Sequence, residues 1–208
     1  LLEQPERRII WYALTAASTG LPFFYAGIIT MLLKLENLIN SFSELLGKIA
    51  GTLLILLLLN VFYDVIARYL FNDVSIGMQE LEWHLYSTMF LLGVSYSLRH
   101  NGHVRVDVIY ERVSRNKQAW IDILGTLLFL LPFTLLVGYY GIGFVIDAYE
   151  MNEQSGDPGG LPYRWIIKSM IPFAFFSMAI SGIGLILHSI NRIRGIHQDD
   201  PTLTSHLS

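Results

Sequence analysis

Two long charge-free apolar stretches constrain this chain more than any other feature of its sequence. One lies between Asp122 and Asp147 and the other between Lys168 and Arg192, and neither contains Asp, Glu, Lys or Arg. The hydrocarbon core of a bilayer is about 30 Å thick, so a helix that crosses it needs roughly 20 mostly apolar residues. Both stretches meet this requirement. They predict transmembrane helices in an all-α integral membrane protein.

Two further stretches, residues 46–70 and 80–98, are predicted to span as well. Their charged residues gather near the ends, where long side chains reach the interface. The link between them is short, which predicts antiparallel neighbours. Only 15% of the 208 residues are charged, against about a quarter in soluble domains, as expected when lipid is the solvent. No basic face or aromatic-basic module points to nucleic acid.

The connectors predict how four such helices are threaded. Lys and Arg gather in residues 99–118 and again in residues 192–194, whereas the links at 71–79 and 150–163 contain neither. Because cytoplasmic loops carry the excess of Lys and Arg, we expect both ends of the four-helix unit to face the cytoplasm. The outer link at 150–163 instead contains acidic residues.

The N-terminal region admits two readings. Residues 32–45 carry apolar residues at three- and four-residue intervals, typical of an amphipathic helix in the interface plane; the alternative is an extended start of the first span. Residues 9–33 are long enough to span, yet rich in Thr, Ser and Gly; we favour an interfacial or partner-packed helix over a fifth span. We therefore expect an N-terminal hydrophobic extension at 1–33, a four-helix membrane domain at 34–195 and a polar cytoplasmic tail at 196–208.

A row of polar residues follows one face of the first span. Asn60, Asp64 and Arg68 are spaced four residues apart, so they share a helix face. Inside a membrane such a row is either an ion or proton relay or a structural clamp. We favour the clamp, in which Asp64 pairs with Arg68, and Arg68 pairs with Glu80 or Glu82 across the short link.

The remaining candidates lie in the connectors. From His103 onward the inner connector alternates polar and apolar residues, so His103, Arg105 and Asp107 would share one face if extended. Metal binding there is the alternative to a hydrogen-bonded connector, which we favour. An inner histidine pair such as His100 and His188 would be needed for haem, and ordinary interfacial histidines are the preferred interpretation.

The outer link contains a turn cluster at residues 155–162, rich in Gly and Pro. A plain helix connector is the preferred reading. The alternative is an external docking surface, for which Glu153 and Asp157 are the candidate contacts. The sequence contains no Walker motif and no nucleophile–base arrangement. We therefore expect neither enzymatic activity nor a cofactor.

Several short motifs follow one another along the chain. They are Arg68-Tyr69-Leu70-Phe71, Glu80-Leu81-Glu82-Trp83, Phe90-Leu91-Leu92-Gly93, His103-Val104-Arg105-Val106-Asp107-Val108 and Gln118-Ala119-Trp120-Ile121-Asp122. In this order and spacing, they resemble the small membrane subunit (DctQ-like small permease) of tripartite ATP-independent periplasmic (TRAP) transporters. The stretch Gly159-Gly160-Leu161-Pro162, followed by Arg164-Trp165, is similar to the subgroup associated with mannitol, chloroaromatic or 2-oxo-acid compounds. The resemblance covers roughly residues 31–194.

The resemblance implies a non-catalytic scaffold in the bacterial inner membrane. Its expected partners are a large membrane subunit that carries the solute and ion sites, and a periplasmic solute-binding protein that delivers an organic acid or a related small solute. Two other functions stay open on the residues alone. One is a haem-holding membrane anchor of a redox enzyme, and the other is a stand-alone small carrier.

Overall fold

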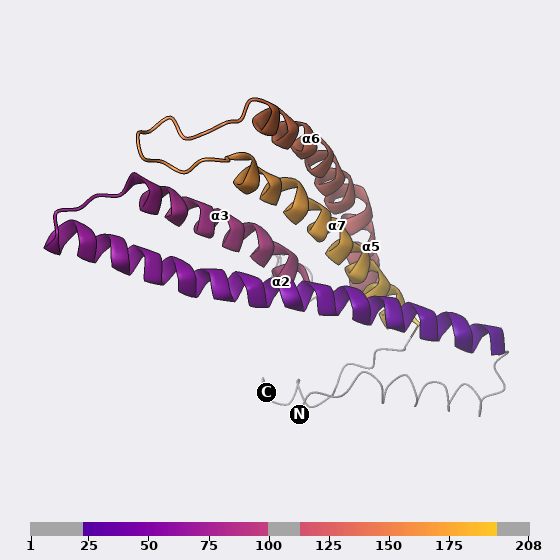
Figure 1. Cartoon of the computed structure of the whole chain (residues 1–208). Helices are drawn as coiled ribbons and strands as arrows, with labels where there is room; N and C mark the ends of the chain where they lie inside the picture. Colours follow the sequence, from indigo (N-terminus) through magenta and orange to yellow (C-terminus); the bar gives the residue numbers. More distant parts are fainter. Residues whose placement is uncertain (1–22, 100–112, 195–208) are drawn as a thin grey trace.

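The computed structural model describes residues 23–99 and 113–194, and every regular element in these two ranges is helical (Figure 1). The elements are α2 (Phe23–Leu70), α3 (Ile76–Arg99), α5 (Arg115–Gly125), the π-helical turn η1 (Thr126–Leu130), α6 (Leu131–Glu150) and α7 (Trp165–Ile193). The expectation of an all-α protein is therefore confirmed for the described residues.

Within the described residues, three helical segments are long and apolar enough to cross a membrane. They are Thr30–Leu70, Asn116–Glu150 and Trp165–Ile193. The first, third and fourth expected spans fall within them. α3 is not among the three, although its 24 residues would rise about 36 Å at 1.5 Å per residue. Its first half carries Glu80 and Glu82, which lower its apolar character. That α3, the second expected span in chain order, crosses the membrane therefore stays a prediction.

α2 is a single helix with no break between its N-terminal half and the first expected span. Its 48 residues correspond to about 72 Å, more than twice the thickness of the hydrocarbon core. The structure thus has the extended start of the first span, and not a separate helix at 32–45. The expected boundary at residue 33 falls inside α2. Residues 1–22, which hold most of the expected N-terminal extension, lie outside the described residues, as does the tail at 196–208.

A wide turn precedes the proline of the third expected span. Pro132 has no N–H and its ring collides with the carbonyl four residues earlier, and the backbone widens into η1 immediately before it. The Thr134 hydroxyl then donates to the carbonyl oxygens of Leu130 at 2.9 Å and Leu131 at 3.1 Å. These are not the carbonyl that Pro132 leaves without an N–H donor, which belongs to Leu128; the hydroxyl bonds back to the preceding turn of its own helix. α5, η1 and α6 consequently form one bent helical rod.

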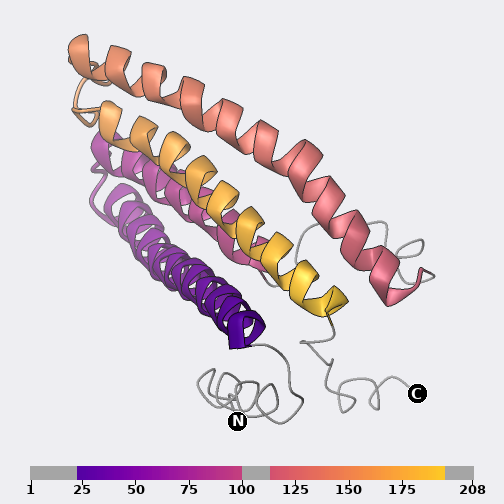
Figure 2. The same cartoon turned by 90° about the vertical axis from the view of Figure 1, so that its right-hand side faces the viewer.

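α7 is the central helix of the arrangement. It packs against α2, α3, α5 and α6, whereas α6 has no comparable contact with α2 or α3 within the described residues. Figure 2 shows α7 between the α2–α3 pair and the α5–α6 rod. Small residues permit its close approaches: an added Cβ on Gly141 of α6 would lie 3.3 Å from Pro172, and one on Gly184 of α7 would lie 2.7 Å from Ile39 of α2. Such contacts are typical of helices packed in lipid.

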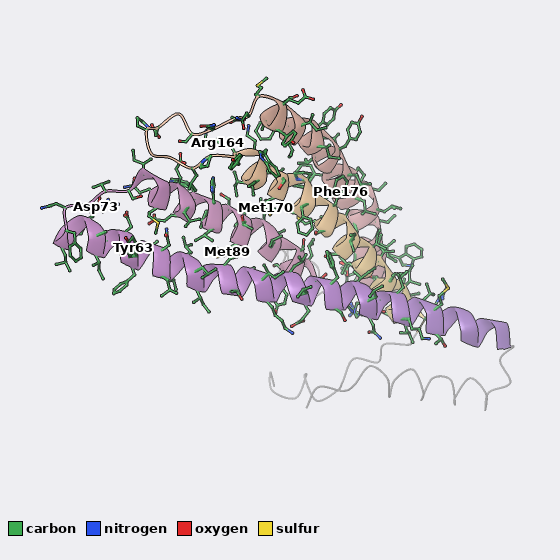
Figure 3. All side chains as sticks on the ribbon, in the orientation of Figure 1. Tyr63, Asp73, Met89, Arg164, Met170 and Phe176 are labelled. Carbon is green, nitrogen blue, oxygen red and sulfur yellow. The ribbon has the colours of Figure 1, made fainter. Side chains whose placement is uncertain are left out.

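The apolar core between α2 and α3 is small. Leu46, Ala50 and Leu92 are buried, and Phe42, Leu53 and Met89 pack around them; Met89 lies where α3 faces α2 (Figure 3). The link between these two helices occupies residues 71–75, where Asn72 adopts a positive φ of 51°, a conformation that Asn tolerates better than most residues. The expected antiparallel pair is therefore present.

Candidate functional site

Polar side chains gather at the two ends of the helices. At one end lie the C-terminal end of α2, the start of α3 and the connector between α6 and α7. Asp73 and Arg164 mark this end in Figure 3. At the other end lie the last turns of α7 and the N-terminal half of α2. We call these the connector end and the opposite end.

At the connector end, the predicted polar row of α2 is partly buried. Arg68 donates to Asp64 through a short contact, and the Asn60 amide donates to the main-chain carbonyl of Met78 in α3 at 3.0 Å. Asn60 and Asp64 are 7% and 3% exposed, while the Arg68 side chain is 44% exposed. The Asp64–Arg68 pair thus lies within α2, and it is Asn60 that joins the end of α2 to the start of α3.

The predicted pairing of Arg68 with Glu80 or Glu82 is absent among the described contacts. Glu80 instead turns to the connector between α6 and α7. It accepts a short hydrogen bond from the Ser155 hydroxyl, a second from the Leu161 amide at 2.6 Å, and an ion pair from Arg164 at 3.9 Å. The physical reason is that the Leu161 amide and the Ser155 hydroxyl lie close to the Glu80 carboxylate, while Arg68 is occupied by Asp64 one turn back on its own helix.

The connector at residues 151–164 has defined internal geometry. The Ser155 amide donates to the Leu161 carbonyl at 3.2 Å, and the Arg164 amide donates to the Glu153 carbonyl at 3.1 Å. Asn152, Gly159 and Tyr163 have positive φ angles of 47°, 86° and 61°. A positive φ is rare for a bulky residue such as tyrosine and persists only where the surroundings impose it. The connector is therefore a folded element.

The two predicted docking residues of this connector have different surroundings. Glu153 forms an ion pair with Lys168 of α7, and Lys168 also lies 3.9 Å from the centre of the Phe144 ring. The Glu153 carboxylate is therefore already paired with a residue of the same chain. Asp157 is exposed at the far side of the connector, where its amide, and not its carboxylate, is bonded to Ser155 at 3.2 Å. Asp157 is the more accessible of the two.

Below the connector, a shallow groove of about 320 Å³ separates the start of α3 from the start of α7. Its lining is mostly apolar, and it also contains His84 and Thr88. The full lining is Leu81, His84, Leu85, Thr88, Leu161, Pro162, Tyr163, Ile166, Ile167 and Met170. The connector therefore forms the roof of this groove.

At the opposite end, a buried carboxylate joins α2 to α7. Glu36 is 3% exposed, and it accepts a hydrogen bond from the Asn191 amide at 2.6 Å and lies 3.0 Å from the His188 ring. Two turns along, the hydroxyls of Ser43 and Ser181 are 2.9 Å apart. These contacts tie the N-terminal half of α2 to the last turns of α7.

Glu36 belongs to the predicted amphipathic helix at residues 32–45, where it stands between the apolar residues, and its burial differs from what an interfacial helix would give. The buried face of this half of α2 mixes Leu33, Ile39 and Leu46 with Glu36 and Ser43, while the outward face carries exposed leucines. Those leucines are Leu35, Leu38 and Leu45. The signal that was available is the spacing: Glu36, Ser43 and Ala50 recur every seven residues, as a single packed seam requires.

The predicted inner-connector residues cannot be placed. His103, Arg105 and Asp107 lie outside the described residues, as does His100, so the metal and haem alternatives at that connector stay predictions. Of the two described candidate histidines, His84 lies at the connector end and His188 lies at the opposite end beside Glu36. In the described ranges, no group of three or more His, Asp or Glu side chains is arranged to hold a metal ion.

Two sets of comparisons bear on identity. Residues 57–192, more than half of the chain, match the family model described as tripartite ATP-independent periplasmic transporters, DctQ component. The chain is 25% identical over 179 residues to the ectoine TRAP transporter small permease protein TeaB of Halomonas elongata, covering 84% of this chain and 82% of that protein.

A second relative is a putative TRAP transporter small permease protein of Haemophilus influenzae. It is 27% identical over 133 residues, covering 64% of this chain and 81% of the relative. The matched family region begins in the C-terminal third of α2 and ends in the last turn of α7, so it includes the polar row of α2, the Glu80 contacts and the connector. These matches agree with the motifs and with the apolar helices. The chain therefore belongs to the DctQ family and is a small permease subunit of a TRAP transporter, a multi-pass protein of the inner membrane.

Proposed function

We propose that this subunit is a non-catalytic scaffold. It supports a large ion-coupled membrane subunit in the uptake of an organic acid or a related small solute, which a periplasmic binding protein delivers. The family supports the general role. The specific role rests on how the helices are arranged.

The observation that carries the proposal is the exposure of the two outer helices. Among the described helices, α7 packs against all the others, whereas α2 and the α5–α6 rod present large apolar side chains outward. On α2 these are Leu54, Ile55, Leu58, Leu59, Phe62 and Tyr63; on the rod they are Leu128, Phe129, Phe133, Leu136, Tyr139 and Tyr140. Surface of this kind suits lipid and a large apolar partner.

The interior offers little to a solute. Between the two polar ends, the α2–α3 contact is filled by Leu46, Ala50 and Leu92, and the α6–α7 contact brings Pro172 against Gly141 and the Phe176 ring against Gly138. A polar solute crossing there would have to leave water without compensating hydrogen bonds, a cost of several kcal/mol. This supports a scaffold over a stand-alone carrier.

The proposed orientation places the connector end in the periplasm and the opposite end in the cytoplasm. The connector end carries exposed Asp73 and Asp157, and the opposite end carries Arg194 and Lys117. This agrees with the excess of basic residues expected on the cytoplasmic side. In this orientation α3 also crosses the membrane, as the second of four spans in chain order. The folded connector faces the binding protein, with Asp157 as its accessible acidic contact.

The solute class rests on the resemblance alone. One relative is named for ectoine, and the connector motif resembles the subgroup associated with mannitol, chloroaromatic or 2-oxo-acid compounds. We propose a small carboxylate-bearing solute on these grounds.

A reconstitution experiment tests the scaffold role. The small subunit is co-expressed with a tagged large subunit and reconstituted in vesicles with the binding protein, and uptake of labelled 2-oxo acids is followed. We expect co-purification of the two membrane subunits and uptake only when all three proteins are present. Uptake by vesicles that contain this chain alone would contradict the scaffold role.

A further inference from the structure

We propose that Glu80 is a positioning residue that holds the connector at residues 151–164 in one conformation, and that this conformation is what the periplasmic binding protein contacts. The inference rests on the proposed function, because it assigns a physical cause to the docking surface of that same scaffold. It concerns α3 and a connector that lies 75 to 81 residues away along the chain.

The first ground is the convergence of donors on one carboxylate. Both oxygens of Glu80 are used: Oε1 meets the Ser155 hydroxyl and Arg164, and Oε2 meets the Leu161 amide. Ser155 lies near the start of the connector, and Leu161 and Arg164 lie near its end. A single side chain of α3 therefore joins both limbs. Hydrogen bonds to a charged group are stronger than those between neutral groups.

The second ground is the close fit of the connector against α3. A Cβ on Gly160 would lie 2.9 Å from Glu80 Oε2 and would overlap Ser155, and a Cβ on Gly77 would lie 3.2 Å from the Gly159 carbonyl oxygen. Two glycines, one on each side of the contact, thus allow the connector backbone to reach the carboxylate. A plain linker between α6 and α7 has no need for this fit.

The third ground is which acidic residue stays exposed when Glu80 holds both limbs of the connector, an arrangement that we call the latch. With Glu80, Ser155 and Arg164 engaged with one another, and Glu153 engaged with Lys168, Asp157 stays exposed. Binding to a preformed loop avoids the entropy that ordering the loop would cost at the moment of contact. The binding protein thus meets a connector that is already ordered.

The consequence of removing Glu80 is therefore a loss of order in the connector more than a loss of contact area. Ordering the backbone of one residue costs about 1 to 2 kcal/mol. If docking must then supply the order of one backbone residue, the association is expected to weaken roughly five- to thirtyfold.

The test has two readouts on the assembled complex of small and large subunits in nanodiscs. The chain contains no cysteine, so Val74→Cys and Gly156→Cys provide two unique labelling sites in this subunit, both in exposed positions. Double electron–electron resonance between spin labels on these two cysteines then gives the distribution of distances between the α2–α3 link and the connector. Titration of the fluorescently labelled binding protein of the same transporter, without these two cysteines, gives the association constant.

Glu80→Ala is expected to broaden the distance distribution and to weaken association roughly five- to thirtyfold. Glu82→Ala is the matched control: it removes the same side chain two residues along α3, and no contact joins Glu82 to the connector in the described structure. It is expected to behave like the wild type. Glu80→Gln, which keeps one acceptor oxygen, is expected to fall between the two.

Each contrary result has a separate meaning. A narrow distribution in Glu80→Ala would overturn the latch. A broad distribution with unchanged association would overturn the positioning role. If the wild-type complex binds no binding protein, the proposed docking function itself fails, and the distance measurement still decides the latch. Should Glu80→Ala prevent assembly, Ser155→Ala removes one donor from the connector without altering α3 and gives the same two readouts.

Discussion

The contact between α6 and α7 provides a stringent test of the fold. Gly141 and Gly143 lie on the same helix, two residues apart, and differ in what surrounds them. A Cβ on Gly141 would lie 3.3 Å from Pro172 Cδ and 3.5 Å from the Pro172 nitrogen, whereas one on Gly143 would have nothing within 4 Å. The proline ring is rigid, because it is closed onto its own backbone nitrogen in α7. Leucine at position 141 must therefore push the two helices apart.

The expected magnitude follows from comparing Gly141→Leu with Gly143→Leu. Both substitutions gain the same helix propensity, about 0.8 kcal/mol relative to glycine, and both add the same apolar side chain. Only the first overpacks an internal contact, which costs about 1 to 3 kcal/mol. For a chain of this size 1 kcal/mol corresponds to about 2 to 4 °C. We therefore expect Gly141→Leu to melt roughly 2 to 12 °C below Gly143→Leu.

Thermal unfolding of the purified subunit in detergent, followed by intrinsic tryptophan fluorescence, measures this difference. Gly141→Ala gives an internal check, because its single added carbon needs a shift of only a few tenths of an ångström and should place it between the wild type and Gly141→Leu. Equal melting temperatures for the two leucine variants would refute the α6–α7 packing described above.

Three further changes test the polar contacts at the two ends. Arg68→Ala should destabilise the subunit by about 2 kcal/mol by leaving the buried Asp64 unpaired, and the double variant with Asp64→Asn should recover most of the loss in the same melting assay. Glu36→Leu removes the acceptor of Asn191 and should cost about 1 to 3 kcal/mol, whereas Glu36→Gln should cost less; identical melting of both would argue against the seam. Thr134→Val should cost about 1 kcal/mol, and an unchanged melting temperature would mean that the hydroxyl bonds to η1 do not contribute.

Much of the fold followed from the sequence because lipid imposes a simple rule on it. Charge-free stretches such as residues 123–146 and 169–191 have to be helices, since every backbone polar group in hydrocarbon must be bonded within its own segment. The turn-forming residues between them mark the connectors. The ordered motifs from Arg68 to Trp165 sufficed to identify the family, which the comparisons confirmed.

The tertiary structure decided which polar groups meet. Glu36, a polar residue of the expected amphipathic helix, is buried against α7. Arg68 was expected to meet Glu80 or Glu82, and Glu80 is instead bonded to Ser155 and Leu161. Both outcomes depend on how each helix is rotated about its axis and on where a distant connector folds back. Hydropathy and spacing describe one helix at a time, whereas partner choice is set by the packing of several. The apolar runs therefore revealed the membrane, and only the packing of α7 against its neighbours revealed the contacts that hold the subunit together.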